Sequence, residues 1–394
     1  MLRAMESKGG IEKADIGIVG AGQLARMMVQ AAIPLGIHIR LLAARPDDGA
    51  ARVSPDVMLG SPDDPKALEA LARGCDVVTF DHELVSAAVL RDLERQGASL
   101  HPSADVMALA QDKRQQRETF AALGLPVPPF SVIAQPDELV AFGEQWRWPV
   151  VVKSARSGYD GRGVWVVESP DEARQLARTL LDTGIEPVAE QWVPIEREVA
   201  ILIARRPSGE RVVYPVVETV QIRGICREIV APASIPAHLT DEAAAIALRI
   251  AESIGLVGIL AVELFVSEGR LIINEIATRP HNSGHYSIEG CVTSQFEQHL
   301  RAVLDWPLGA TDLTAPAVVT VNILGNEAGE DPRSRLPEAL AIPGAHVHLY
   351  GKEARPGRKL GHVTVCGMDM EDVRERARRA AAILGAALPE PVAV

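Results

Sequence analysis

The N-terminal third of the chain alternates short, mainly apolar runs with longer segments in which apolar residues recur at helical spacing. The runs at 15–19, 37–42 and 76–80 predict buried strands, while the segments 23–35 and 65–73 predict helices. Consecutive strands joined by helices are typical of a parallel sheet, because parallel strands need long crossover connections. We therefore expect a parallel-sheet α/β domain in this part of the chain.

The pattern changes after a predicted helix at 104–123 and a proline-rich link at 125–129. Further strands are expected at 150–153, 164–167, 187–191, 258–266, 271–276, 318–323, 346–350 and 362–365, and further helices at 170–182, 240–254 and 370–385. These changes predict an α/β domain at 1–124, an α+β domain at 125–315 and a small domain at 316–394.

The acidic composition narrows the classes of protein that fit. The 394 residues carry a formal net charge of −12, which disfavours general binding to nucleic acid or acidic membranes. The four cysteines lie far apart, with no pair at metal-ligand spacing, which favours reduced thiols. No secretory signal and no apolar run long enough to span a bilayer are found in the sequence. We therefore expect a soluble, cytoplasmic protein.

A glycine-rich turn, Gly20-x-Gly22-x-x-Ala25, follows the first predicted strand and precedes a helix. Such a turn can present backbone N–H groups to an anion at the start of the helix. A dinucleotide site also needs an acidic residue at the end of the second strand, where this chain has Leu41 to Ala44. NAD binding is thus disfavoured, and a structural turn and an anion-contacting loop both remain open.

A second glycine-rich stretch runs from Lys153 to Gly163 and is not a Walker loop, because no Gly-Lys-Ser/Thr ends it. An ordinary hairpin is the simplest alternative. The stretch instead packs three cations and Asp160 among glycines and serines, which suits a tight two-residue hairpin poorly. A loop whose cations and N–H groups close over phosphates fits this composition better.

Two acidic residues, Glu263 and Glu275, lie in neighbouring predicted strands. If these strands form a hairpin with a three-residue loop centred on Gly269, the two carboxylates lie directly opposite, with Cβ atoms about 5 Å apart. Their side chains are then expected to share strand faces with Phe265 and Ile273, respectively. Facing carboxylates repel unless a proton or a cation separates them, and Mg²⁺ with phosphate oxygens is a natural occupant. A pairing of either Glu with Lys or Arg, or a register slip, is the alternative.

Two polar segments follow the acidic pair. The segment 279–285, Arg-Pro-His-Asn-Ser-Gly-His, concentrates hydrogen-bond donors that can hold a small oxyanion. The segment 352–359 carries four cations against one Glu, which is unusual in an acidic chain. It predicts either exposed charges that protect a sheet edge from pairing with another chain or a binding site for a substrate phosphate.

Together these segments resemble one family, 5-(carboxyamino)imidazole ribonucleotide synthase of the ATP-grasp superfamily. The resemblance runs from Gly17 to about Thr364 and rests on the motifs at 20–27, 158–163, 274–277, 279–285, 293–297 and 355–359. It implies an ATP-grasp enzyme with an N-terminal Rossmann-like domain, a two-part ATP-grasp core and a small C-terminal domain. The two parts of the core would be a lid at about 130–195 and a metal-binding core at about 196–315. It also implies a cytoplasmic homodimer that carboxylates 5-aminoimidazole ribonucleotide with ATP and bicarbonate in purine biosynthesis.

The resemblance implies a role for each matching residue. Glu263 and Glu275 would hold two Mg²⁺ ions, and Arg279, His281, Asn282, Asp160 and Arg162 would be the catalytic residues around bicarbonate and the imidazole. The implied ATP-binding residues are Lys113, Lys153, Gly158, Tyr159, Asp160, Gly161, Arg162, Gly163, Glu190, Gln191, Trp192, Val193, Glu198, Gln221, Asn274 and Glu275. The implied substrate-binding residues are Gly22, Gln23, Tyr159, Arg162, Lys352, Arg355 and Arg358.

The chain departs from the family pattern at a few positions. Where many members have Asp-Arg followed by Lys, this chain has Asp112-Lys113 and then Arg117, which keeps the charge. Gln221 stands where His is expected, which puts that ATP contact in doubt. Alternatives to the carboxylase are another ATP-grasp ligase of the transformylase or biotin-carboxylase type, an NAD-dependent oxidoreductase and a non-catalytic binding module.

Overall fold

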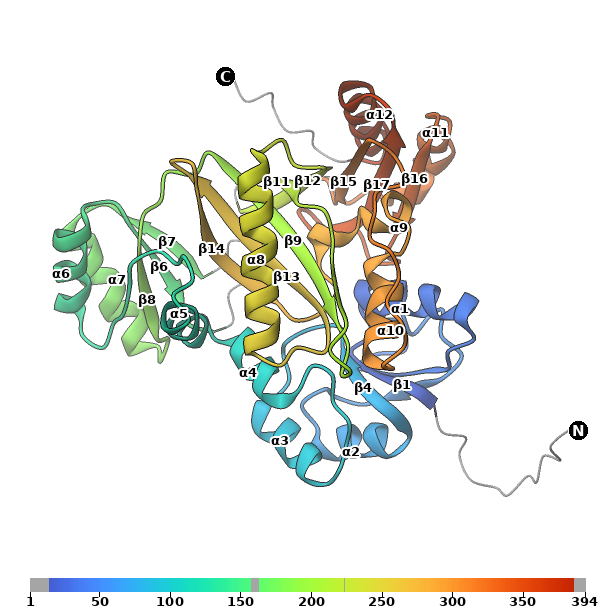
Figure 1. Cartoon of the computed structure of the whole chain (residues 1–394), viewed down its shortest axis with the longest axis horizontal. Helices are drawn as coiled ribbons and strands as arrows, with labels where there is room; N and C mark the ends of the chain where they lie inside the picture. Colours follow the sequence, from blue (N-terminus) through green and yellow to red (C-terminus); the bar gives the residue numbers. More distant parts are fainter. Residues whose placement is uncertain (1–13, 157–162, 223, 386–394) are drawn as a thin grey trace, which may run out of the picture. The chain divides into compact units, whose positions relative to one another are not determined.

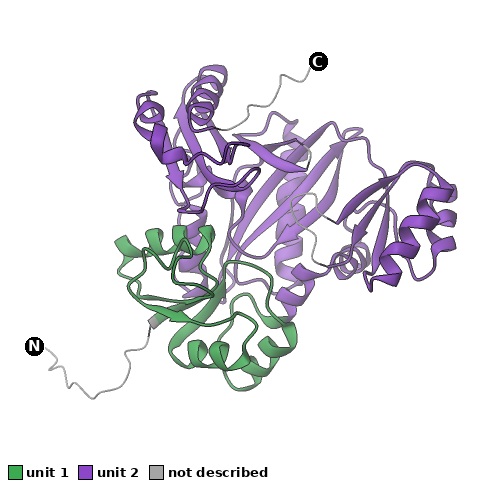
Figure 2. Ribbon diagram, turned by 180° about the vertical axis from the view of Figure 1, so that it is seen from behind, with its two compact units in different colours: residues 1–104 green, residues 105–394 purple. Residues whose placement is uncertain are grey.

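A computed structural model describes residues 14–156, 163–222 and 224–385 of the chain. The chain forms two compact units, residues 1–104 and residues 105–394, which Figure 2 shows in different colours. The division falls inside the expected first domain. The boundaries expected at 124/125 and 315/316 therefore stay a prediction.

The first unit contains the expected parallel sheet. Its strands are β1 (Ala14–Val19), β2 (Ile39–Ala43), β3 (Val57–Leu59) and β4 (Cys75–Phe80), in the order β3-β2-β1-β4. Its helices are α1 (Gln23–Ala32), the 3₁₀ turn η1 (Ile33–Leu35), α2 (Pro65–Arg73) and α3 (Ala87–Arg95). Ile16, Ile18 and Leu41 are fully buried, as expected for a parallel sheet that is covered on both faces.

The helix expected at 104–123 is two helices, α4 (Ala104–Gln111) and α5 (Lys113–Ala122). The backbone of Asp112 is extended, and its carboxylate accepts a hydrogen bond from the N–H of Gln115 at 3.2 Å. Aspartate is a preferred N-cap because its side chain satisfies an unpaired N–H of the first turn. The expectation of one helix was therefore wrong, since Asp112 ends one helix and begins the next.

The second unit contains a four-stranded antiparallel sheet in the region expected to be a lid. It consists of β5 (Phe130–Val132), β8 (Pro187–Gln191), β6 (Val150–Ser154) and β7 (Val164–Val167), with helices α6 (Pro136–Trp146) and α7 (Pro170–Asp182) (Figure 1). Val150, Val152 and Val167 of the sheet pack against Leu139 and Ala173 of the two helices. This separate core makes the lid a small packed layer of its own.

A nine-stranded sheet within the described residues forms the rest of the second unit. Its strands are β9 (Arg197–Arg205), β10 (Arg211–Val213), β11 (Val217–Ile222), β12 (Ile225–Ala231), β13 (Gly258–Ser267), β14 (Arg270–Ala277), β15 (Ala317–Leu324), β16 (Ala345–Leu349) and β17 (Lys359–Gly367). The order is β14-β13-β9-β11-β12-β15-β17-β16, with β10 paired to β9. The last three strands therefore extend the same sheet, because β15 pairs antiparallel with β12.

Helices cover this sheet. Helix α8 (Ala237–Ser253) lies across β9 and β13 (Figure 1). Its Ile246 and Ile250 belong to the same buried core as Leu260 and Val262 of β13. The other elements are η2 (Asn282–Gly284), α9 (Ser287–Gly290), α10 (Gln295–Val303), η3 (Pro332–Arg335), α11 (Leu336–Leu340) and α12 (Met370–Ile383). Among the described residues, no helix combines the length and the apolar character that crossing a membrane requires.

Candidate active site

The two acidic strands, β13 and β14, form a hairpin with a tighter turn than expected. Ser267 pairs with Arg270, so the loop contains two residues, Glu268 and Gly269, and the expectation of three was wrong. Both loop residues have positive φ, 49° and 71°. Positive φ at both residues is typical of the type I′ turn, whose twist matches that of the strands in a two-residue hairpin.

A β-bulge brings the acidic residues opposite each other. Leu264 pairs with Ile273, whereas the preceding residue, Glu263, pairs with Glu275, so Asn274 is the extra residue on its strand. The facing pair of Glu263 and Glu275 is therefore confirmed. Its cause is the bulge rather than a longer turn, because an unbroken two-residue hairpin would pair Glu263 with Asn274.

The bulge also changes which face of the strand Glu275 occupies. Leu271, Ile273 and Ile276 all belong to the core beneath α8, so the alternation of the strand is shifted after Asn274. The expectation that Glu275 shares a face with Ile273 was therefore wrong. The shift turns Glu275 away from that core, toward the face of Glu263.

The acidic side chains on this face are only partly balanced by cations. Burial and then the charges of Glu275 and Glu198 raise the pKa of Glu263 to about 8. Glu198, on the adjacent strand β9, has its pKa raised to about 7 by burial and by the charge of Glu275. Burial by itself raises the pKa of Glu275, but the ammonium of Lys113, 2.9 Å from Glu275 Oε2, outweighs burial and lowers this pKa.

This electrostatic imbalance fits a divalent cation. A carboxylate such as that of Glu263, whose pKa is raised by burial and by neighbouring carboxylates, gains from a metal ion beside it. Among the described residues, no group of three or more His, Cys, Asp or Glu side chains is arranged to hold a metal. The two carboxylates would thus need oxygen ligands from a phosphate-bearing ligand, which is the usual coordination of Mg²⁺.

A buried network of charges lies beside the acids and joins the lid to the large sheet. Lys153 Nζ on β6 lies 2.8 Å from Glu190 Oε2 on β8 and donates to Asn274 Oδ1 at 3.1 Å. Arg117 on α5 donates to Glu190 Oε1 at 2.8 Å and to the backbone oxygen of Asn274 at 2.6 Å. The carboxylate of Glu190 is therefore held by two cations.

Arg117 is the residue of this network that the sequence did not assign to the site. It is 1% exposed and Glu190 is 3% exposed. Burial by itself raises the pKa of Glu190, but the charges and hydrogen bonds of Arg117 and Lys153 outweigh it and hold the pKa at about 2. The spacing of Arg117 and the buried Phe120 on one face of α5 is a signal that could have predicted its burial.

The segment 279–285 reaches the same acids. The imidazole Nε2 of His281 lies 3.7 Å from Glu263 Oε1, while its Nδ1 is 2.9 Å from the hydroxyl of Ser283. Arg279 donates to the backbone oxygen of Pro280 at 3.0 Å. The buried Oδ1 of Asn282 has no hydrogen-bond partner among the described residues, which leaves it able to accept from a ligand.

The other predicted nucleotide contacts lie on strands of the second unit or directly after one. Gln191 ends β8, Trp192 follows it with 44% of its surface exposed, and Val193 comes next. Gln221 lies on β11, paired with Cys226 of β12. Their roles in nucleotide binding stay predictions.

The basic segment 352–359 is partly neutralised by its own acid. Arg355 Nη2 lies 2.6 Å from the carboxylate of Glu353, and Arg358 donates to the backbone oxygen of Glu353 at 3.2 Å. Lys352 Nζ is 5.7 Å from the ring centroid of Tyr350. The role of this segment in phosphate binding stays a prediction.

The first glycine-rich turn is closed by an acid of its own unit. The N–H of Gly22 donates to Asp81 Oδ2 at 2.5 Å, and a Cβ added to Gly20 would come within 1.9 Å of the same carboxylate. The position of Asp81 therefore requires glycine at position 20. Its carboxylate also accepts from the N–H of Gly22, which would otherwise be available to a bound anion. The roles of Gly22 and Gln23 in substrate binding stay predictions.

Five predicted residues of the second glycine-rich stretch, Gly158, Tyr159, Asp160, Gly161 and Arg162, lie outside the described residues. Gly163 follows them, and its backbone oxygen accepts from the N–H of Ser154 at 2.9 Å. Their proposed contacts with nucleotide and substrate remain untested.

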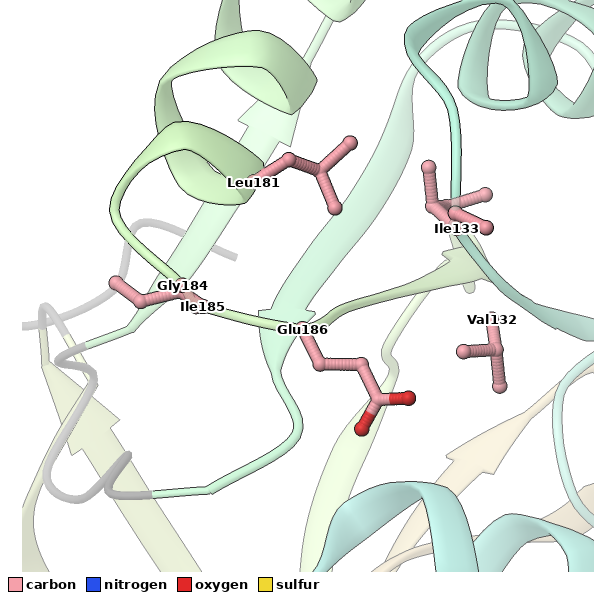
Figure 3. A pocket seen from close by; sticks show the side chains of 7 residues that line it. Val132, Ile133, Leu181, Gly184, Ile185 and Glu186 are labelled. Atoms are coloured by element: carbon pink, nitrogen blue, oxygen red, sulfur yellow. The ribbon is translucent and has the colours of Figure 1, made fainter.

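A pocket of about 300 Å³ lies elsewhere in the lid (Figure 3). Val132, Ile133, Leu181, Ile185 and Glu186 line it, together with Ala134 and Gly184. None of these residues belongs to the predicted site, and the lining is mainly apolar. The pocket therefore does not mark the chemistry described above.

Family models match three consecutive parts of the chain. They are the ribonucleotide synthetase preATP-grasp domain at residues 13–111, the ATP-grasp domain at residues 118–296 and the phosphoribosylaminoimidazole carboxylase C-terminal domain at residues 318–376. The three matches follow the order of the expected N-terminal, ATP-grasp and C-terminal regions.

Relatives match almost the full length of the chain. The N5-carboxyaminoimidazole ribonucleotide synthase of Mycobacterium tuberculosis is 46% identical, over 93% of this chain and 86% of the relative. That of Synechococcus elongatus is 41% identical, over 94% and 93%. A crystal structure of the synthetase from Thermus thermophilus is 37% identical, with a TM-score of 0.84 over 95% of this chain and 99% of that one. The Aspergillus clavatus enzyme, solved with ADP and 5-aminoimidazole ribonucleotide, is 33% identical, with a TM-score of 0.87 over 95% and 100%.

Proposed function

The chain belongs to the N5-carboxyaminoimidazole ribonucleotide synthase family of ATP-grasp enzymes, and from this premise we propose that it carboxylates 5-aminoimidazole ribonucleotide with ATP and bicarbonate. The reaction forms N5-carboxyaminoimidazole ribonucleotide, ADP and phosphate in purine biosynthesis. The observation that carries the proposal is the facing pair of Glu263 and Glu275 beside Lys153, in a chain that matches the family over nearly its full length.

The charged residues between lid and sheet suit the binding of ATP. Lys153 and Lys113 would contact nucleotide phosphates, because both ammonium groups lie in the network that contains Asn274 and Glu275. Glu190 to Val193 would meet the adenine, and Glu198 the ribose. Mg²⁺, held by Glu263 and Glu275, would supply positive charge beside the phosphate oxygens. The burial of these groups strengthens electrostatic interactions with the transferred phosphoryl group.

The chemistry proceeds in two balanced steps. A bicarbonate oxygen attacks the γ-phosphorus of ATP while the bond to the β-phosphate oxygen breaks, which gives ADP and carboxyphosphate. The exocyclic amine of the ribonucleotide then attacks the carboxyl carbon, phosphate leaves and the amine loses a proton. Arg279, His281 and Asn282 would surround bicarbonate and the imidazole, since His281 lies beside Glu263. Arg279 offers a cation to the oxyanions of both steps.

The substrate phosphate would bind the basic segment 352–359. Lys352→Ala is expected to raise the KM for 5-aminoimidazole ribonucleotide by about 10- to 150-fold and to leave the KM for ATP unchanged, because it removes a cation worth about 1.5–3 kcal/mol to a charged acceptor. Steady-state kinetics with each substrate varied in turn measures both constants. The exposed Lys66 provides the control, since Lys66→Ala should alter neither constant. A defect of Lys352→Ala on the ATP side instead would remove the segment from this role.

A coupled assay of ADP release tests the proposed function. ADP should form only when bicarbonate and 5-aminoimidazole ribonucleotide are both present. Turnover that depends on formate and glycinamide ribonucleotide would identify a different ATP-grasp ligase. Saturable binding of NADH would support the alternative of an NAD-dependent oxidoreductase. The proposal also includes that the protein is a cytoplasmic homodimer. Light scattering after size-exclusion chromatography measures the oligomeric state.

A further inference from the structure

The segment 293–297, Thr-Ser-Gln-Phe-Glu, belongs to the motifs of the family resemblance but has no role in the chemistry above. In the structure it begins helix α10, with the hydroxyl of Ser294 accepting from the N–H of Glu297 at 3.2 Å. The side chain of Gln295 is fully buried, which is uncommon for a residue of this type. A buried amide needs hydrogen-bond partners, and those of Gln295 lie in the segment 279–285.

Gln295 binds both sides of the His281 backbone. Its Oε1 accepts from the N–H of His281 at 2.9 Å, and its Nε2 donates to the backbone oxygen of His281 at 2.8 Å. Since a backbone N–H can only donate and a carbonyl oxygen can only accept, these two bonds fix the orientation of the amide. The same Nε2 lies 3.2 Å from Nδ1 of His285. One side chain thus contacts the segment 279–285 at His281 and at its last residue, His285.

No other side chain reproduces this pattern. Glutamate has the same shape but cannot donate when ionised, and asparagine is one methylene shorter. The approach is also close, because a Cβ on Gly284 would come within 2.4 Å of Gln295 Oε1. The loop therefore accommodates Gln295 only with glycine at position 284.

The same contacts continue toward the basic segment. The ring of His285 lies 5.0 Å from that of His362, whose Nδ1 is 2.7 Å from the hydroxyl of Tyr350. Burial, and then the charges of His281 and other neighbours, keep the pKa of His285 well below its usual range, which favours a neutral ring. Its Nδ1 accepts from Gln295, because an amide nitrogen can only donate. Tyr350 precedes Lys352 by two residues. The chain of contacts thus runs from the His281 loop to the segment proposed for the substrate phosphate.

We propose that Gln295 is a positioning residue, which holds His281 where bicarbonate and the imidazole react. The inference rests on the proposed function, because it assigns Gln295 a role through His281 and not through contact with substrate. Misplacing a reacting or contacting group by about 1 Å costs about 10²-fold in rate. The nucleotide site involves other residues, so binding of ADP should not depend on Gln295.

The test compares Gln295→Glu with a matched variant on the same helix. Gln298 is also fully buried on α10, and it makes the same pair of bonds to another backbone, that of Gly309, at 2.7 and 2.8 Å. Gln295→Glu and Gln298→Glu should therefore lower the melting temperature to a similar extent. Only Gln295→Glu should lower kcat/KM for 5-aminoimidazole ribonucleotide, by about 10²-fold, with the Kd for ADP changed less than about 3-fold.

Each result of this experiment is decisive. Wild-type protein is assayed first, and absence of ribonucleotide-dependent ADP release there would refute the proposed function itself. With an active wild type, equal kinetics of the two Gln→Glu variants would overturn the positioning role. If Gln295→Glu does not fold, Gln295→Asn retains a neutral amide and must show the same loss of kcat/KM with unchanged ADP binding; wild-type kinetics in this variant would also overturn the inference.

Discussion

Glu275→Gln is expected to lower kcat by about 10²–10³-fold while the fold is retained. The substitution keeps the shape of the side chain but removes a charge from the pair that would hold metal beside the phosphates. It also removes the ion pair with Lys113, whose Nζ lies 2.9 Å from Glu275 Oε2. Steady-state ADP release measures kcat, and circular dichroism with thermal melting reports on the fold.

An exposed acid provides the control for this variant. Glu252 pairs with Arg211 at 2.9 Å, with both side chains nearly half exposed, so Glu252→Gln should change neither kcat nor stability appreciably. Near-normal turnover of Glu275→Gln would mean that the facing carboxylates do not take part in the reaction.

Glu190→Gln is expected to destabilise the second unit by roughly 3–5 kcal/mol, because two buried cations then lose their shared counter-ion. Arg117 and Lys153 both lie 2.8 Å from the carboxylate of Glu190. Thermal melting should show a decrease of several degrees, and the affinity for ADP should fall because Lys153 loses the partner that orients it. If Glu190→Gln binds ADP with wild-type affinity, Glu190 does not orient Lys153 for nucleotide binding.

A second ion pair, between α5 and the residue that precedes β8, is the matched control. Arg114 on α5 lies 2.8 Å from Glu186, the same distance as Arg117 from Glu190, but both side chains are about 40% exposed. Glu186→Gln should therefore cost less than about 1 kcal/mol. Equal losses of stability for the two variants would show that burial does not determine the strength of this network.

The effect of Glu190 should not vary with pH in the neutral range. Its folded-state pKa of about 2 lies below the ordinary value of 4.5, so its stabilisation is present above the unfolded-state pKa and is lost as the pH falls toward 2. The difference in stability between wild type and Glu190→Gln should thus be constant between about pH 6 and pH 8. A difference that disappears within this range would contradict the ionised state of Glu190.

The sequence predicted the facing acids but not the geometry that produces them. Residue types and approximate strand positions identified Glu263 and Glu275. The bulge at Asn274 could not be predicted, because the alternation of apolar residues along a strand does not show where a residue is left unpaired. The assumed three-residue loop and the missed bulge were two errors that cancelled in the pairing, and the wrong face of Glu275 followed from the missed bulge. Two wrong local assumptions thus led to the correct contact.

Long-range charge networks were the least predictable part of the site. Arg117 and Glu190 are 73 residues apart, and nothing in either local sequence shows that the lid brings them together. Strands β11 and β12 were not predicted, because each mixes charged or polar residues with apolar ones. Strand β9 was missed although its residues 199–204 are a continuous apolar, buried run. The parallel sheet of the first unit was predictable, since its strands are short apolar runs separated by helical segments.

The central claim is that one site uses ATP to activate bicarbonate for transfer to the ribonucleotide amine. Reaction with ¹⁸O-labelled bicarbonate tests it directly, because a bicarbonate oxygen that attacks the γ-phosphorus remains in the phosphate when carboxyphosphate is cleaved. Phosphorus NMR should show one ¹⁸O atom in each phosphate released together with ADP. Unlabelled phosphate, formed at the same rate as ADP, would contradict this account of the reaction.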